Sequence, residues 1–84
     1  MKLLKFSAEW CSPCSEQKNR LEEYDATPVV EIDVDSDEGM DRANVYTVRS
    51  LPTMVLLDDN DQPVERWTGL TEVSEIEESV ESYK

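Results

Sequence analysis

The sequence contains no histidine and only two cysteines among its 84 residues. A zinc site usually takes four ligands from cysteine and histidine, so these counts argue against a metal site within one molecule. Long hydrophobic runs are also missing. The apolar start Met1–Phe6 is too short for a signal peptide, and no later segment approaches the roughly 20 apolar residues of a transmembrane helix. We therefore expect a cytoplasmic protein with no bound metal and no membrane partner.

Basic residues are scarce, because eight Lys and Arg residues face twenty Asp and Glu residues, for a net charge of −12. Binding to phosphates needs a basic surface, so we do not expect nucleic acid or anionic lipid as a partner. Basic or neutral proteins are the favoured partners. The acidic residues are spread along the chain and only four lysines are present, which fits a protein that stays soluble in concentrated salt. An ordinary solvated acidic surface is the alternative explanation.

The first half of the chain shows alternating strand and helix patterns. A strand is predicted over Lys2–Ala8, and a weakly amphipathic helix from Ser12 to about Tyr24. Val29–Asp35 alternates with period two, which predicts a second strand. Ser36 is a good N-cap for a short helix that runs to about Val45. Strands separated by helices in this way are expected to pair in parallel.

The second half predicts a hairpin followed by a helix. Leu51–Leu57 is a buried-looking strand, residues 58–62 have turn composition, and Pro63–Thr68 is the returning strand. A final helix over Thr71–Tyr83 carries apolar residues on one face at Val73, Ile76, Val80 and Tyr83. The order β-α-β-α-β-β-α and the short length predict a single α/β domain over residues 1–84 with one core.

The two cysteines stand in the stretch Trp10-Cys11-Ser12-Pro13-Cys14, directly after the first predicted strand. This spacing brings both sulfurs together at the start of a helix, where backbone N–H groups and the helix dipole favour a thiolate. Cys11 is then expected to expose its sulfur and Cys14 to lie one turn inside. In a reducing cytosol, such a cysteine pair indicates a catalytic role rather than a structural one. Half of a zinc site, or a structural disulfide that closes a very short loop, is the alternative.

Three signals then follow in order: Trp10-Cys11-Ser12-Pro13-Cys14, then Arg49-Ser50-Leu51-Pro52-Thr53 at the head of the third predicted strand, and Gly69 after the fourth. With them the chain resembles the thioredoxin family over nearly its whole length, although it lacks the N-terminal βα unit of full-length thioredoxins. The resemblance implies the minimal thioredoxin fold, a four-stranded mixed sheet flanked by three helices.

The resemblance also implies roles in substrate binding. Pro52 is expected to be cis and to stand against the two sulfurs, and the backbone of Leu51 is expected to pair with an incoming substrate strand. Trp10 would shield the disulfide and contact substrate, and Gly69 belongs to the same substrate-binding surface. An ordinary trans proline at the start of an edge strand, and simple packing of Trp10, are the alternatives. Arg49 is interpreted as solvated surface.

The mechanism that the resemblance implies is thiol–disulfide exchange. Cys11 is the nucleophile that attacks a protein disulfide, Cys14 is the resolving thiol, and a reductase or another dithiol then reduces the Cys11–Cys14 disulfide. No cofactor is implied, and a monomer is expected. Two alternatives stay open: a glutaredoxin-like protein that uses a small-molecule thiol, and a non-catalytic module whose acidic surface docks a partner protein. The sequence lacks the Gly-Gly pair with which glutaredoxins bind glutathione.

Lys5 and Glu31 form the last candidate pair. Thioredoxins usually carry a buried aspartate six residues before the first cysteine and a lysine on the neighbouring parallel strand. Here the resemblance puts Lys5 and Glu31 on these positions, with their charges exchanged. Period-two alternation places Lys5 on the same face of its strand as Leu3 and Ser7. Glu31 is then a candidate base for Cys14 and Lys5 a modulator of the site, whereas an exposed ion pair is the alternative.

Overall fold

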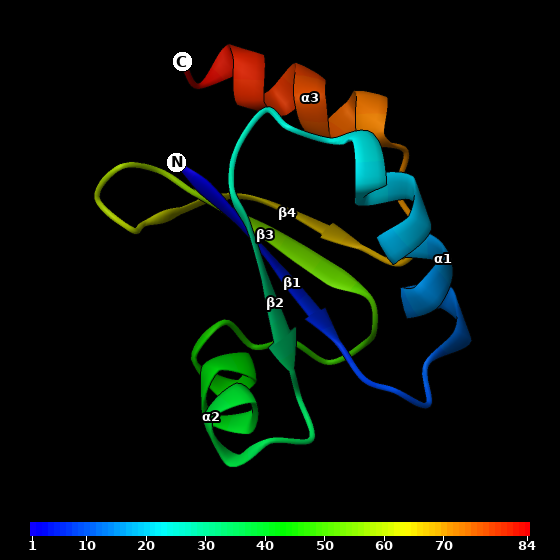
Figure 1. Ribbon diagram of the computed structural model, residues 1–84. Coiled ribbons are helices and arrows are strands. Elements are labelled where there is room, and N and C mark those ends of the chain that lie inside the picture. Colours follow the sequence, from blue (N-terminus) through cyan, green and yellow to red (C-terminus); the bar gives the residue numbers. More distant parts are fainter.

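The computed structural model describes residues 1–84 as four strands that form one sheet, with helices on both of its faces (Figure 1). In chain order the elements are β1 (Lys2–Ser7), α1 (Ser12–Arg20), the short 3-10 helix η1 (Leu21–Glu23), β2 (Val29–Asp33), α2 (Asp37–Val45), β3 (Thr53–Leu57), β4 (Pro63–Thr68) and α3 (Val73–Ser82). This order confirms the predicted β-α-β-α-β-β-α arrangement. None of the helices has the length and apolar character needed to span a membrane.

The sheet has the strand order β2-β1-β3-β4. Strands β1 and β2 pair in parallel, as the helix between them predicts, and their register puts Lys5 opposite Glu31. Strand β3 runs antiparallel to both β1 and β4, so the sheet is mixed. The predicted four-stranded mixed sheet flanked by three helices is therefore confirmed.

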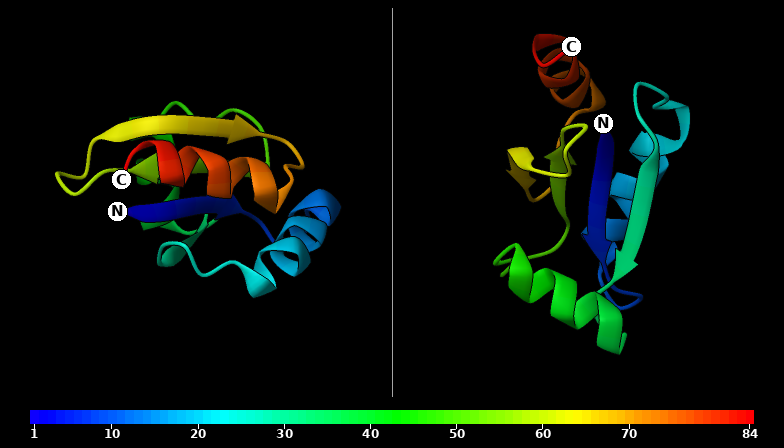
Figure 2. Two further views of the ribbon diagram at one scale, coloured as in Figure 1. Left: turned by 90° about the horizontal axis from the view of Figure 1, so that it is seen from above. Right: turned by 90° about the vertical axis from the view of Figure 1, so that its left-hand side faces the viewer.

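Alternation along β1 divides the core between the two faces of the sheet. Leu3 packs with residues of η1 and α3, whereas Leu4 and Phe6 pack with Ala43 of α2. Figure 2 shows the same division, with α1 and α3 on one face of the sheet and α2 on the other. Lys5 and Ser7 alternate with Leu4 and Phe6, so they lie on the face that α1 covers.

The elements differ from the predicted ones mainly at their ends. The first helix stops at Arg20 and continues as η1, after which buried Tyr24 is held by a 2.8 Å hydrogen bond between its hydroxyl and Thr27. The third strand begins at Thr53, after the proline. Tyr83 was expected on the buried face of the last helix, but it lies just beyond α3 and is 46% exposed. Its hydroxyl donates a hydrogen bond to the carbonyl oxygen of Val64 instead.

Helix α2 is anchored to the end of β2 by a close backbone contact. The Ser36 hydroxyl donates a hydrogen bond to the carbonyl oxygen of Asp33 (2.7 Å) and accepts one from the Gly39 N–H (3.0 Å). A Cβ atom on Gly39 would overlap the carbonyl oxygen of Asp33, which belongs to the backbone. Only glycine therefore lets α2 approach the strand this closely.

We predict that Gly39→Ala destabilises the protein by about 1–3 kcal/mol, because α2 must move away from Asp33 to accommodate the new methyl group. In an unconstrained helix the same change stabilises by roughly 0.5–1 kcal/mol. Urea unfolding of the wild type, Gly39→Ala and Asn44→Ala measures the effect. Asn44 lies on the exposed side of α2 and is the control that should keep or slightly raise the stability. A Gly39→Ala protein as stable as the wild type would contradict the anchoring.

Candidate active site

The two cysteines form a disulfide at the N-terminus of α1, with their Cα atoms 5.3 Å apart. Cys11 is the N-cap residue, and its Sγ accepts a hydrogen bond from the backbone N–H of Cys14 at 3.2 Å. Cys11 is only 5% exposed and Cys14 only 3%, so the expected exposure of the Cys11 sulfur is wrong for the disulfide form. The packing of Ala8, Val34 and Leu51 around the two sulfurs explains this burial.

A groove of about 550 Å³ opens beside Cys11. Trp10 lines one part of it and is 69% exposed, while its indole N–H donates a 2.9 Å hydrogen bond to the carboxylate of Asp35. Leu51 and Arg49 line the part formed by the segment before β3. The Trp10 ring is therefore held at the groove by its polar edge, instead of being buried in the core.

The segment before β3 and the loop after β4 meet next to this groove. The Leu51–Pro52 peptide bond is cis, as predicted. The backbone N–H of Gly69 donates a 2.8 Å hydrogen bond to the carbonyl oxygen of Pro52. Gly69 has a φ of 85°, a backbone conformation that favours glycine. Residues from three distant parts of the sequence, Cys11, Pro52 and Gly69, are thus brought to one end of the sheet.

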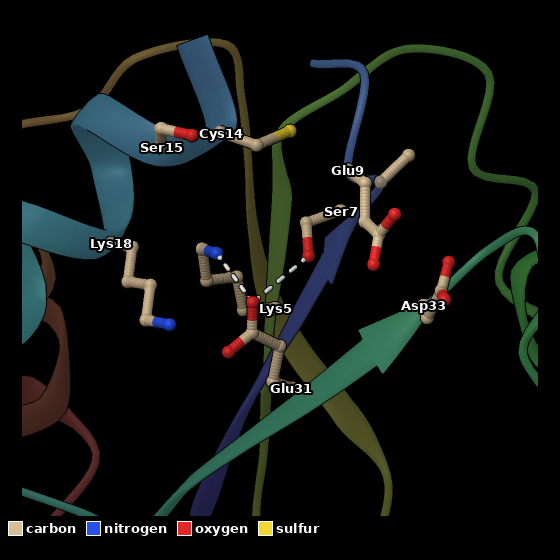
Figure 3. Close-up of a pocket in the computed structure, with 9 residues that line it drawn as sticks. Lys5, Ser7, Glu9, Cys14, Ser15, Lys18, Glu31 and Asp33 are labelled. Atoms are coloured by element: carbon tan, nitrogen blue, oxygen red, sulfur yellow. Dashed lines mark hydrogen bonds and ion pairs between the residues drawn. The ribbon is translucent and has the colours of Figure 1, made fainter. Parts of the chain in front are cut away.

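A second cavity, of about 410 Å³, lies beneath α1 and contains the predicted Lys5–Glu31 pair (Figure 3). Lys5 Nζ lies 3.1 Å from Glu31 Oε1, and the Ser7 hydroxyl donates to the same oxygen at 3.2 Å. The pair is asymmetric, because the Lys5 side chain is only 3% exposed whereas that of Glu31 is 49% exposed. Cys14 lines this cavity from α1, so the structure places the pair and the second cysteine around one space.

Electrostatics keep Glu31 ionised. Partial burial of Glu31 on its own raises the pKa of its carboxyl group. The hydrogen bond and the charge of Lys5, together with the Ser7 hydroxyl and the charge of Lys18, outweigh burial and lower that pKa below its ordinary value. The buried ammonium group of Lys5 therefore faces a carboxylate at neutral pH.

Sequence reasoning missed the roles of Gln17, Ser7 and Asp35. Gln17 is completely buried on α1 and hydrogen-bonds to the backbone of Thr71. Its position was the available signal, because residue 17 lies three residues after Cys14 and four before Leu21, on one face of the predicted helix. Asp35 and Ser7 gave no such signal, since acids and serines are common at strand ends. Arg49 is exposed, as expected, but it also lines the groove.

Comparison with known proteins gives a consistent result. The family model described as Thioredoxin matches residues 1–82. The thioredoxin of Mycolicibacterium smegmatis is 40% identical over 72 residues, which cover 80% of this chain and 63% of that protein. The thioredoxin of Chlamydia trachomatis is 38% identical over 72 residues, which cover 81% of this chain and 68% of that protein. This chain thus spans less than two thirds of the length of the M. smegmatis protein.

Among solved structures, a mutant thioredoxin from Halobacterium salinarum superposes with a TM-score of 0.83 at 35% sequence identity. The match covers 98% of this chain and 73% of that one. A Fasciola hepatica thioredoxin gives a TM-score of 0.80 at 28% identity and covers 99% of this chain and 80% of that one. Nearly every element of the fold therefore has a counterpart in these structures.

We predict that Glu31→Gln lowers the free energy of unfolding by roughly 1 kcal/mol at pH 7, because the buried Lys5 loses its charged partner while Glu31 itself stays half in water. The folded-state pKa of Glu31 is lowered, so its stabilising contribution is complete above its unfolded pKa near 4.5 and is lost as the pH falls through the folded value. The difference between the wild type and Glu31→Gln should therefore shrink as the pH falls through the folded-state pKa of Glu31.

Urea unfolding of the oxidised proteins between pH 7 and pH 3 measures this difference. Glu16→Gln is the matched control, because Glu16 is exposed on α1 and makes no ion pair. A difference that stays constant over the whole pH range would show that Glu31 is not held as a carboxylate by Lys5.

Proposed function

This chain belongs to the thioredoxin family, and we propose that it reduces protein disulfides by dithiol exchange through Cys11 and Cys14. The observation that carries the proposal is the Cys11–Cys14 disulfide, which caps α1 beside a groove shared by Trp10 and Leu51. A metal-binding role has no comparable support, because no three potential metal-ligating side chains cluster in the structure.

The reaction begins with the reduced protein. The Cys11 thiolate attacks one sulfur of a substrate disulfide, so that a Cys11–substrate disulfide forms and the other substrate sulfur leaves as a thiolate, which takes a proton from water. Cys14 then loses its proton and attacks Cys11 Sγ. The Cys11–Cys14 bond forms, the mixed disulfide breaks, and the second substrate thiol is released. Two electrons have passed to the substrate, and a reductase or another dithiol must return them.

The first turn of α1 supports the nucleophile. The Cys14 N–H already points at Cys11 Sγ in the disulfide form. In the reduced form the same N–H and the helix dipole would stabilise a thiolate on Cys11. In the groove, the exposed Trp10 ring and the backbone of Leu51 before the cis proline would hold the substrate segment next to that sulfur. Gly69 would complete this surface from the other side of Pro52, to which it is hydrogen-bonded.

Glu31 is proposed as the base for the resolving step. Cys14 and Glu31 line the same cavity, and the carboxylate of Glu31 stays ionised at neutral pH. Across this cavity it would take the Cys14 proton through water and pass it on to the solvent, since half of its side chain is exposed. Lys5, as an ammonium group, cannot take that proton, so its role is to orient the carboxylate and offset its charge.

We predict that Glu31→Gln slows resolution of a preformed mixed disulfide by about tenfold to hundredfold. The alkylation rate of Cys11 should stay near the wild-type value, because Cys11 lines the other cavity. Stopped-flow release of the substrate thiol measures the resolving step directly. Glu9→Gln is the matched control, since Glu9 lines the same cavity without a contact to Lys5. Resolution at the wild-type rate in Glu31→Gln would remove Glu31 from the mechanism.

Reduction of insulin disulfides with dithiothreitol as the electron source tests the function itself. The wild type should accelerate the reaction, and Cys11→Ser should not. A rate no faster than dithiothreitol alone would instead favour the non-catalytic docking module. Insulin reduction that is faster with reduced glutathione than with a dithiol as the electron source would favour the glutaredoxin-like alternative. Cys14→Ser, which cannot resolve the mixed disulfide, would trap the natural substrates on Cys11.

The cellular setting is proposed from charge and composition. The excess of acids supports basic or neutral protein partners, a monomer and adaptation to concentrated salt. The Cys11–Cys14 pair, which works in a reducing compartment, supports a cytoplasmic location. Nucleic acid and membranes are not proposed as partners.

If the acidity is an adaptation to salt, the melting temperature should rise steeply from dilute buffer to molar potassium chloride. The reason is that the screening length shortens to about 3 Å at 1 M salt and repulsion among the acids fades. Thermal melts over a potassium chloride series measure this dependence. A midpoint that does not move with salt would leave the acidity as ordinary surface composition.

A further inference from the structure

The side chain of Gln17 connects the active-site helix to the loop that follows β4. Gln17 lies on α1, three residues after Cys14, and is 0% exposed. Its Nε2 donates to the carbonyl oxygen of Thr71 at 3.1 Å, and its Oε1 accepts from the Thr71 N–H at 2.8 Å. Both ends of the amide are therefore paired with one backbone unit, 54 positions away in the sequence.

The Gln17 amide supplies the hydrogen-bond partners that the buried backbone of the loop requires. Thr71 is itself 5% exposed, so its backbone N–H and carbonyl group have little access to water. Buried backbone groups without a partner are costly, and an apolar side chain at position 17 would leave both of them unpaired. A fully buried glutamine is equally costly unless its amide is satisfied. Each group therefore requires the other, and the contact holds only in one relative position of α1 and the loop.

One ion pair reinforces this contact, and two hydrogen bonds extend it to the substrate groove. Arg20, one turn further along α1, forms an ion pair with Glu72 at 2.9 Å. Within the loop, the Thr71 hydroxyl donates to the carbonyl oxygen of Gly69 at 3.0 Å. The Gly69 N–H in turn donates to the carbonyl oxygen of Pro52. In Figures 1 and 2 the start of α3 and the loop before it lie beside α1.

We propose that Gln17 is a positioning residue that holds the 69–71 loop, and through it the cis Leu51–Pro52 segment, at a fixed place relative to Cys11. A substrate protein must contact Cys11 on α1 and the 51–52 and 69–71 backbone at the same time. Loss of the Gln17 amide would let these two parts of the binding surface move against each other. A small disulfide needs only the sulfur and is insensitive to that movement. This inference rests on the proposed reduction of protein disulfides.

The test compares two substrates in Gln17→Met, which keeps the length of the side chain and removes both hydrogen bonds. We expect kcat/KM for insulin to fall about tenfold or more, mainly through KM, since a shift of about 1 Å can cost a hundredfold. The rate with the small aromatic disulfide 5,5′-dithiobis(2-nitrobenzoate) should stay within about twofold of the wild type. Hydrogen exchange at the Thr71 amide should lose its protection.

Val80→Ala is the control for stability. Val80 is 1% exposed in the core between the sheet and α3, and its hydrophobic cluster contains no residue of the site. The Val80→Ala substitution should lower the melting temperature without changing the ratio of the insulin rate to the small-disulfide rate. If Gln17→Met does not fold, Gln17→Asn serves instead, because it keeps the amide on a side chain one methylene too short to reach both groups of the Thr71 backbone. Its insulin kcat/KM should fall while the small-disulfide rate is kept.

The outcomes separate the two proposals. A wild-type protein that fails to reduce insulin overturns the proposed function. A wild type that reduces insulin, with both Gln17 variants showing an unchanged ratio of the two rates, overturns the role of Gln17. Equal losses on both substrates would also overturn it, because that is the effect of a general structural defect. Loss confined to insulin, with exposure of the Thr71 amide, supports it.

Discussion

The architecture depends on β1 being buried on both faces while it pairs with a strand on each side. Leu3, Leu4 and Phe6 are fully inaccessible to water, and the parallel partner β2 and the antiparallel partner β3 fix their register. Because β1 ends at Ser7, the chain leaves the centre of the sheet and reaches Cys11 within a few residues. The cysteine pair therefore stands at one end of the sheet, beyond the central strand β1, where β2 also ends and the segment before β3 arrives.

Much of this arrangement is readable from the sequence, because the signals are local. Alternation in Val29–Asp35, the apolar face of the last helix and the N-cap Ser36 each report on their own few residues, and each element is found, with shifts of a few residues at the ends. The position of Pro52 and its cis bond followed from the family resemblance. The Lys5–Glu31 contact could be expected because a parallel register converts positions on two strands into neighbours.

The remaining features depend on contacts between distant segments, which no local pattern reveals. Gln17 looks like a misplaced polar residue until the Thr71 backbone is seen beside it. Asp35 looks like one acid among twenty until the Trp10 indole points at it. The burial of Cys11 could not be foreseen either, because it comes from Leu51 and Val34, which reach the disulfide from other parts of the chain. In each case the deciding partner is far away in the sequence.

The two cysteines border different cavities, Cys11 the groove and Cys14 the space above Lys5 and Glu31. A protein that covers the groove would shut water out from around Cys11. It would leave the second cavity open, because Glu31 at its edge remains half in solvent. Proton release from Cys14 and substrate docking at Cys11 would thus use two separate openings. In the proposed mechanism, the Cys14 thiol would therefore release its proton to bulk water while the docked substrate still covers the mixed disulfide.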